Sequence, residues 1–425
     1  MWSARNAKRG FFPLDERLGL LPGNLSPYSH ESLVRLGAWI PFGPVAQLLK
    51  EILGIQVSKA SVVRSTEAAG AAYVTIQTQE ADRIEQEAPP APPAGGDKMV
   101  ISVDGALVPL RQGVWAEVKT LVIGEVLPPV MERGEPVVHT RKLSYFSRLV
   151  TAERFQHLTL VEMHRRGIEH CQHVEAVMDG AEWEQGFVDY HCSQAVRVLD
   201  FAHAGQRIGG IGQICFGEAS PEASQWINER LHQLKHQGPD ALLVELNQLK
   251  QQHPQSAVIA ENLAYLEKRR SQMQYPQFQT QGWAIGSGIV ESGNKLVVEA
   301  RLKGAGMHWE RDHVDPMLGL RNIICSDRWS EEWPLIADQL SREAKQRRKE
   351  LHQEHCIARA PMTTPLLADP IVEAMTEPIA AIEPCLDQQP NLPKSYGPGR
   401  PAANHPWRHF PFGRALYEQS TPAKK

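Results

Sequence analysis

The sequence predicts a mixed α/β domain that follows a helical segment and is interrupted by a helical insertion. The strand patterns lie between about residues 99 and 204, where short runs of valine, leucine and aromatic residues alternate with two helical stretches. Their order is β-β-β-α-β-α-β, so that an antiparallel set of strands is extended by parallel ones. Around Glu218 to Arg270 the chain is instead rich in Gln, Leu, Glu and Lys, which predicts an all-helical insertion.

Changes in composition divide the chain into six stretches. These are a helical N-terminal domain at 1–86, a Pro/Gly linker at 87–98, the first part of the α/β core at 99–217, the helical insertion at 218–278, the final helix of the core at 279–333, and a basic, Pro-rich tail at 334–425. The linker "EAPPAPPAGGDK" suits neither a helix nor a strand ladder. We expect the tail to be mostly loosely ordered.

Composition narrows the class of protein. The 425 residues are 42% hydrophobic and 22% charged, with a net charge of -4, which is ordinary for a water-soluble protein. The net charge does not indicate nucleic-acid binding, but such binding depends on local patches. No apolar run could span a bilayer, and the N-terminus has no signal-peptide core, so we expect a cytoplasmic protein without a membrane partner. The six cysteines form no Cys-x-x-Cys pair, which favours free thiols.

The N-terminal domain shows helix-start signals in close succession. Ser26-Pro27, Gly43-Pro44 and Ser58 each precede an apolar-periodic stretch, and Gly54 ends the second of these. Short helices joined by a glycine-containing turn fit a helix-turn-helix at about 26–70. Its second helix would present Lys59 and Arg64 to DNA. The alternative is a helical bundle without DNA contact.

Two Asp-Gly pairs follow apolar strands in the predicted core. They are Asp104-Gly105 in "VISVDGALVPL" and Asp179-Gly180 in "VMDGAEW". Carboxylates at the ends of neighbouring strands converge and repel each other, and a divalent cation removes that penalty. Oxygen ligands suit Mg²⁺ or Mn²⁺, and two such ions can assist phosphoryl transfer. The alternative is that each aspartate only caps a turn.

A third acidic ligand is expected on the late helix in "GSGIVESGNKLVVEARLKG", for which Ser287 is the predicted cap. Glu291 lies in the first turns of this helix, where it could cross the sheet beside the first and fourth strands. Glu299, two turns later, is the competing residue.

These residues and the sequence motifs around them resemble a known family. The stretches "SVDGALVPL", "WAEVKTLVIGEV", "LSYFSRL", "VMDGAEW", "DFAHA", "GSGIVESGNKLVVEARLKGAGMHW" and "NHPWR" are similar to ISKra-type insertion-sequence transposases of the DDE class. The resemblance runs from about Gly10 to Trp329. It implies an RNase H-like catalytic core, with Asp104, Asp179 and Glu291 as the catalytic and metal-binding carboxylates.

Two local features qualify the resemblance. "DFAHA" places Asp200 and His203 as in the Asp-x-x-His signature of Mutator-like transposases, which implies an accessory role; a helix cap or a core histidine is the alternative. Relatives also carry a cysteine-bearing stretch before the equivalent of "GFFPLDERLGL", whereas "MWSARNAKRG" has no cysteine.

The "HCQH" run at 170–173 has no second metal-binding pair and is interpreted as a solvated face.

The segment after the late helix, "RLKGAGMHW", predicts further DNA contacts. Arg301 and Lys303 lie close in sequence to the proposed site, and glycines beside cations permit close approach to phosphates. Trp309 could stack on an unpaired base. The alternative for Trp309 is a buried core residue.

The sequence thus predicts a DNA transposase that cleaves phosphodiesters at the element ends and transfers strands to target DNA. The expected cofactor is Mg²⁺ or Mn²⁺, as two ions, and the expected partners are double-stranded terminal repeats, target DNA and further copies of the chain. The resemblance places it at the bacterial nucleoid in the cytoplasm. The alternatives are an RNase H-like nuclease without strand transfer and an inactive, DNA-binding remnant of a transposase.

Overall fold

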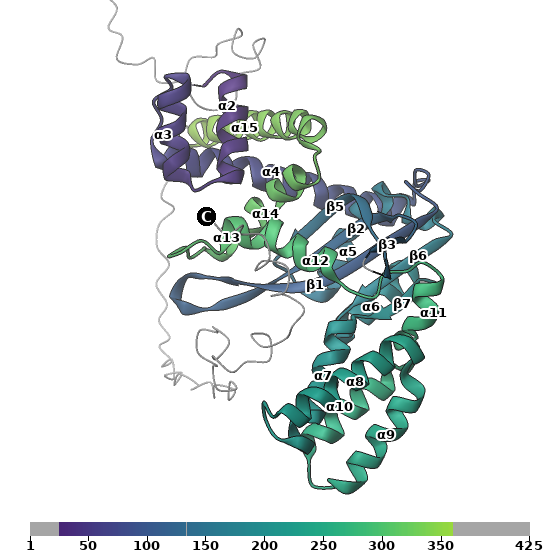
Figure 1. The fold of residues 1–425 in the computed structure, drawn as a ribbon. Coiled ribbons are helices and arrows are strands. Elements are labelled where there is room, and N and C mark those ends of the chain that lie inside the picture. Colours follow the sequence, from purple (N-terminus) through teal and green to yellow (C-terminus); the bar gives the residue numbers. More distant parts are fainter. Residues whose placement is uncertain (1–24, 133, 360–425) are drawn as a thin grey trace, which may run out of the picture. The chain divides into compact units, whose positions relative to one another are not determined.

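A five-stranded mixed sheet forms the centre of the computed structural model, which describes residues 25–132 and 134–359 (Figure 1). Its strands lie in the order β5-β2-β1-β6-β7. The three strands β1, β2 and β5 pair antiparallel, and β6 and β7 extend the sheet parallel to β1. The strands are β1 (Lys98–Pro109), β2 (Trp115–Val126), β5 (Thr140–Arg148), β6 (His173–Met178) and β7 (Val196–Leu199). This confirms the predicted mixed α/β class and the order of its strands.

Helices cover both faces of the sheet because side chains alternate along each strand. One face packs on the end of α4 (Lys59–Glu87), on α5 (Ala152–Arg165) and on α6 (Glu182–Cys192), with Phe155 and Phe187 at the centre. The other face packs on the late helical segment and α14 (Arg311–Cys325). The late segment consists of α12 (Gly288–Gly293), the π-helical turn η5 (Asn294–Glu299) and α13 (Ala300–Leu302).

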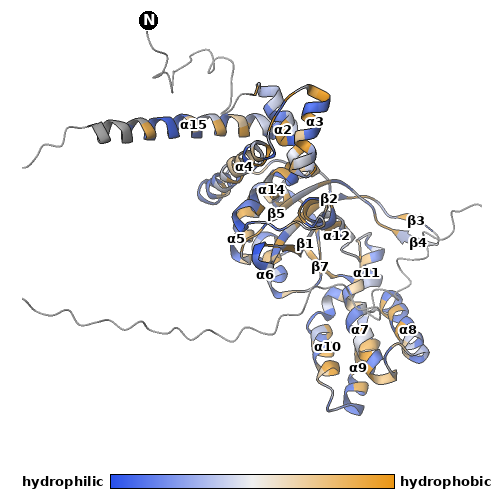
Figure 2. Ribbon diagram, turned by 90° about the vertical axis from the view of Figure 1, so that its left-hand side faces the viewer, coloured by the Kyte–Doolittle hydropathy of each residue, from blue (hydrophilic) through white to orange (hydrophobic). Residues whose placement is uncertain are grey.

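The predicted insertion is helical and follows α7 (Phe201–Phe216). It contains α8 (Pro221–Gln237), α9 (Pro239–Gln252), α10 (Ala257–Lys268), η4 (Arg270–Met273) and α11 (Tyr275–Thr280). Figure 2 shows apolar and hydrophilic stripes along α7 to α10, as expected for amphipathic helices that bury one side. Their buried leucines include Leu231, Leu242 and Leu263.

The structure differs from the sequence predictions at two places. β7 ends at Leu199, so "DFAHA" opens α7 instead of continuing a strand; the Asp200 side chain caps that helix. A short hairpin of β3 (Val130–Glu132) and β4 (Glu135–Val137) was not predicted. The remaining short elements are η2 (Arg111–Gly113) and η3 (Ile168–His170).

The N-terminal helices share a core with the last helices of the chain. α2 (Pro27–Trp39) and α4 begin at the predicted caps Ser26 and Ser58, and α3 (Phe42–Leu53) begins one residue before the predicted Gly43, with Pro41 at its N-cap position. α4 continues far beyond the length of a recognition helix. Their apolar residues pack with those of α14 and of α15 (Trp329–Arg359). The beginning of the predicted loose tail is therefore helical as far as Arg359, since Trp333 and Ile336 anchor it in this core. Residues 360–425 lie outside the described residues.

The predicted linker has neither helix nor strand between α4 and β1, and it packs on the protein. Gly167, with φ +62°, lies against the backbone of Pro92 and Ala94. Four cysteines can be described, Cys171, Cys192, Cys215 and Cys325, and all are free thiols as predicted. Within the described ranges, no helix has the length and apolar character needed to cross a membrane.

The crossing of α4 and α14 gives a first prediction. A Cβ atom at Gly70 would overlap the carbonyl oxygen of Pro316, which is backbone and cannot rotate away. We expect Gly70→Ala to lower the free energy of unfolding by about 1–3 kcal/mol, although alanine ordinarily favours a helix by about 1 kcal/mol. Gly43→Ala on α3 is the matched control, because a Cβ there meets nothing within 4 Å. Urea unfolding of both variants measures the difference; a stabilised Gly70→Ala protein would contradict this packing.

Candidate metal centre

Asp104 and Asp179 occupy equivalent places relative to the pairing of the neighbouring strands β1 and β6. The parallel pairing of β1 with β6 ends at the pair Ser102 and Val177. Asp104 lies two residues after Ser102, and Asp179 lies two residues after Val177. β6 ends there, as predicted, but β1 continues to Pro109 because it pairs with β2 along its whole length. Asp104 is thus inside a strand, and the expectation that its strand ends there is wrong. The parallel pairing with β6 does end there, so both aspartates lie just beyond the last paired residues.

The two Asp-Gly pairs differ in their backbone. Gly180 has φ +88°, so it makes the sharp turn expected after Asp179. Gly105 stays in the strand, where it leaves room for the side chain of Glu117 on β2. Each aspartate accepts a backbone hydrogen bond through Oδ1, Asp104 from Gly105 N at 2.6 Å and Asp179 from Ala181 N at 2.7 Å. The other carboxylate oxygen of each is not used in these bonds.

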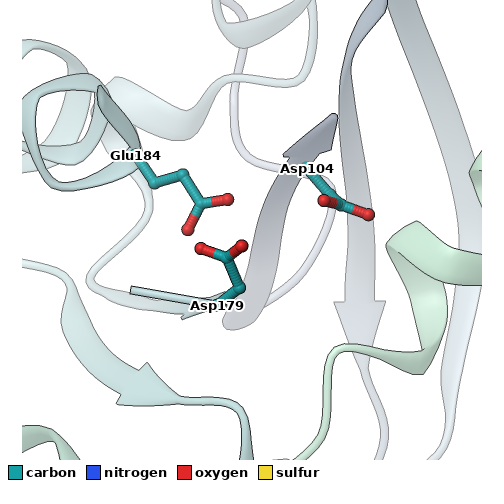
Figure 3. A group of neighbouring side chains, drawn as sticks. All are labelled: Asp104, Asp179 and Glu184. Atoms are coloured by element: carbon teal, nitrogen blue, oxygen red, sulfur yellow. The ribbon is translucent and has the colours of Figure 1, made fainter. Parts of the chain in front are cut away.

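Glu184 is the third carboxyl group of the cluster, and the sequence analysis missed it. Asp104, Asp179 and Glu184 each offer an oxygen within 4.8 Å of the other two. Figure 3 shows the Glu184 carboxyl directed at Asp179 from the first turn of α6. Its Oε2 also accepts a hydrogen bond from Gly180 N at 3.1 Å. A glutamate at this place in a helix commonly reaches back to the preceding turn, which is the signal that could have identified it.

Burial and mutual repulsion hold protons on this cluster. Burial raises the pKa of Asp104 to about 6, and the charge of Asp179 adds to the effect. The Glu184 side chain is 1% exposed; burial, with a hydrogen bond to Asp179 and the charges of both aspartates, raises the pKa of Glu184 to about 10. Carboxyl groups that repel in this way suit a divalent cation, which replaces the protons. The donors are hard oxygens, as Mg²⁺ and Mn²⁺ require, so the residues fit the predicted cofactor.

The late helix contributes Asn294 to this cluster. Its Nδ2 donates to Asp104 Oδ2 at 2.9 Å, across the face of the sheet that α12 and η5 cover. Glu291, the predicted third ligand, lies on α12 one helical turn before Asn294 and is half-buried. It is not one of the three carboxyls within 4.8 Å of one another. Glu299, its competitor, binds Lys303 instead, with Oε1 and Nζ 2.7 Å apart.

Asp200 supports the site from the end of β7. It is 2% exposed, and its Oδ1 accepts from the N–H groups of Ala202 and His203 at the start of α7. Its Oδ2 accepts from Ser287 N at 2.7 Å and from the Ser287 hydroxyl. Ser287 is the N-cap residue of α12, as expected, but its hydroxyl binds Asp200 and makes no capping bond to the helix. Asp200 joins α7 to the start of the late helix.

His203 lies near enough to the cluster for its charge to lower the pKa of Asp104, against the larger effect of burial. Its Nδ1 is buried without a hydrogen-bond partner and lies 3.8 Å from Asp200 Oδ1. In the Asp-x-x-His pair, Asp200 is the residue that caps α7, and His203 lies close to the acids.

The insertion holds the turn that follows Asp179. The Tyr265 hydroxyl donates to the Asp179 carbonyl, and Arg269 Nε donates to the Gly180 carbonyl at 2.8 Å. Arg269 also stacks on Tyr265, with its guanidinium carbon 3.9 Å from the ring centre. The sequence gives no local pattern for these contacts, because they join residues 86 and 89 positions apart in the chain.

Two of the predicted DNA-binding residues are in the core. Trp309 is 7% exposed, its indole N–H donates to the Leu302 carbonyl, and it packs edge-on against Phe42. This corrects the expected base-stacking surface in favour of the buried alternative. Arg301 is 2% exposed and donates to the Gly37 carbonyl of α2, and burial lowers its pKa to about 10. It ties the late helix to α2 and offers no open surface to a phosphate.

The other predicted DNA-binding residues are accessible. Lys59 and Arg64 are exposed at the start of α4, and Lys303 is half-buried in its ion pair with Glu299. The "HCQH" run joins no group of three metal-ligating side chains in the described part of the chain.

No protein-family model matches the chain, and no curated protein matches it. The geometry and the residues of the chain therefore carry the functional argument.

The protonation of Glu184 gives a second prediction. In the folded protein the pKa of Glu184 lies above its ordinary value of 4.5. The protonated carboxyl therefore makes its full contribution to stability below about pH 4.5, and this contribution declines as the pH rises toward 10. Glu184→Gln has no proton to lose and keeps an acceptor for Gly180 N–H. We expect the variant to gain stability relative to the wild type between pH 5 and pH 9 without added metal.

Glu182→Gln, on the exposed side of the same helix, is the control for this comparison. Its folded carboxyl has a lowered pKa, because Lys268 hydrogen-bonds to it, so the trend should not appear. Thermal unfolding at each pH measures the differences. Parallel pH curves for Glu184→Gln and the wild type would show that Glu184 is not held protonated.

Proposed function

We propose that the protein is a DDE-type DNA transposase with an RNase H-like core, which cleaves phosphodiesters at the ends of a mobile element and joins them to target DNA. The observation that carries the proposal is the convergence of Asp104 and Asp179 from equivalent positions on neighbouring parallel strands. The strand order, with three antiparallel strands followed by two parallel ones, supports the RNase H-like assignment. The amino-acid sequences of the motifs resemble those of insertion-sequence transposases, which points to the same cleavage and joining of phosphodiesters.

The residues of the cluster divide the work between them. Asp104 and Asp179 would hold divalent cations through the carboxylate oxygens that their backbone bonds leave free. When bound, such cations activate an attacking oxygen and stabilise a leaving oxygen. Glu184 keeps the Asp179 turn in place and can exchange its proton for cation charge. Asp200 and Ser287 fix the start of the helix that carries Glu291 and Asn294.

The proposed reaction has two steps at one site. A water oxygen attacks the phosphorus at the element end, and the 3′ oxygen leaves with a proton as a free hydroxyl. That hydroxyl then attacks a target phosphodiester, where another 3′ oxygen leaves. No protein group becomes covalently attached, which is consistent with a cluster made of carboxylates. A nuclease without strand transfer would perform the first step alone.

Removing the acids tests the chemistry. We expect Asp104→Asn, Asp179→Asn and Glu291→Gln each to lower cleavage of labelled element ends by roughly 100-fold or more, because each loses a charge that the transition state requires. Folding and end binding, measured in Ca²⁺, should remain. Asp240→Asn, on the exposed first turn of α9, is the control.

The outcomes of this assay separate the alternatives. Cleavage without joined products would favour the nuclease, and end binding without cleavage by the wild type would favour the inactive remnant. Full activity of both aspartate variants would refute the proposed site. Full activity of Glu291→Gln alone would remove Glu291 from it.

The N-terminal helices supply a separate test of DNA binding. Because α4 shares its core with α14 and α15, deleting these helices would expose apolar surface, so point variants are needed. We expect Lys59→Glu and Arg64→Glu to weaken end binding and to reduce its dependence on salt, as loss of phosphate contacts does. Lys250→Glu, exposed on α9, makes the same change of net charge and should bind as the wild type. Equal binding by all three proteins in a salt titration would exclude α4 from the DNA interface.

A further inference from the structure

Asn294 has a buried oxygen that lacks a partner beside the acidic cluster. The residue is 6% exposed and begins the π-helical turn η5. Its Nδ2 is bonded to Asp104 Oδ2 at 2.9 Å, while its Oδ1 is buried and accepts no hydrogen bond. A buried carbonyl oxygen without a donor is unfavourable, so its retention calls for an explanation.

The packing around Asn294 fixes its place above Asp104. The preceding residue, Gly293, lies directly on the sheet: a Cβ there would be 2.7 Å from Val122 Cγ2 and 3.2 Å from Tyr145 Cε1. After it, Val297 and Val298 are fully buried against the same face. A π-helical turn is uncommon and often occurs at functional sites. The late helix is thus pressed onto β2 and β5, with Asn294 held over Asp104.

The amide can present either of its atoms to the cluster. Rotation by half a turn about the last side-chain bond exchanges the oxygen and the nitrogen and keeps the shape of the group. With a cation present, Asp104 Oδ2 has a positive partner and no longer needs the amide N–H. The oxygen of Asn294 would then lie at the place that its Nδ2 now occupies, beside the Asp104 carboxylate.

We propose that Asn294 is a ligand of the divalent cation held by Asp104 and Asp179, and that it binds through its amide oxygen. Hard cations accept amide oxygens together with carboxylates. A neutral ligand also adds no negative charge beside Asp104, Asp179 and Glu184, where one more carboxylate would increase the repulsion. The inference rests on the metal site of the proposed function, but it assigns a ligand from the late helix on different observations.

Binding of Mn²⁺ to the full chain, without DNA, tests the proposal independently of cleavage. We expect Asn294→Ala to weaken Mn²⁺ binding by at least tenfold in calorimetry, the size of effect seen when groups of a metal site are removed. Asn294→Asp keeps an oxygen at the same place and should bind at least as tightly as the wild type. Ser292→Ala, on the exposed side of α12, is the control and should bind as the wild type. Thermal unfolding without metal checks that each variant is folded.

The variants distinguish a ligand from a hydrogen-bond donor to Asp104. If Asn294 only donates, Ala and Asp both remove the N–H and should weaken Mn²⁺ binding alike, which would overturn the proposal. Wild-type affinity in both variants would also overturn it.

Asp179→Asn separates this inference from the proposed function. If the wild type binds Mn²⁺ and Asp179→Asn does not, the proposed metal site is supported. The Asn294 variants then test only whether Asn294 is a ligand of the cation. If Asp179→Asn binds as well as the wild type, the cation lies elsewhere, and both proposals fail.

Discussion

The parallel pairing of β1 with β6 is the constraint on which the candidate site depends. Its register sets Ser102 beside Val177, and so gives Asp104 and Asp179 the same height in the sheet. A shift by one residue would turn one aspartate to the opposite face, because side chains alternate along a strand. Alternating apolar residues prevent such a shift: Met99, Ile101 and Val103 fill the core under α5 and α6. The same pattern that buries the sheet therefore aligns the acids.

The site combines groups from both faces of the sheet at this one point. Glu184 comes from α6, and Asn294 comes from the late helix on the other face. Both lie beside the aspartates just beyond the end of the parallel pairing. This arrangement accumulates carboxyl groups in a buried place and raises the pKa values of Asp104 and Glu184. Such a cluster is unfavourable by itself and becomes favourable when positive charge is bound.

The sequence predicted the parts of the molecule that follow from local patterns. Strand positions, the helical insertion, the capping serines Ser26 and Ser58 and the two aspartates all have signals within a few residues. The errors arose where contacts between distant segments decide the outcome. Arg301 lies at the end of the late helix and Trp309 follows it, and only the packing of α2 and α3 on this segment shows that both are buried. Glu184 and Asn294 were missed because their roles depend on helices that dock onto the sheet.

Arg301 illustrates a further consequence of the way the N-terminal helices are attached. Its guanidinium lies over the rings of Phe42 and Trp309 and binds the backbone of α2, while α4 shares its apolar side with α14 and α15. The helices proposed to bind DNA and the sheet proposed to cleave it therefore share buried contacts and do not form separate domains. In evolution, such a protein cannot acquire a new recognition segment by simple exchange of α2 to α4. A replacement segment would need an apolar surface that packs on α14 and α15. Changes of specificity are therefore expected to arise by substitution on the exposed side of these helices.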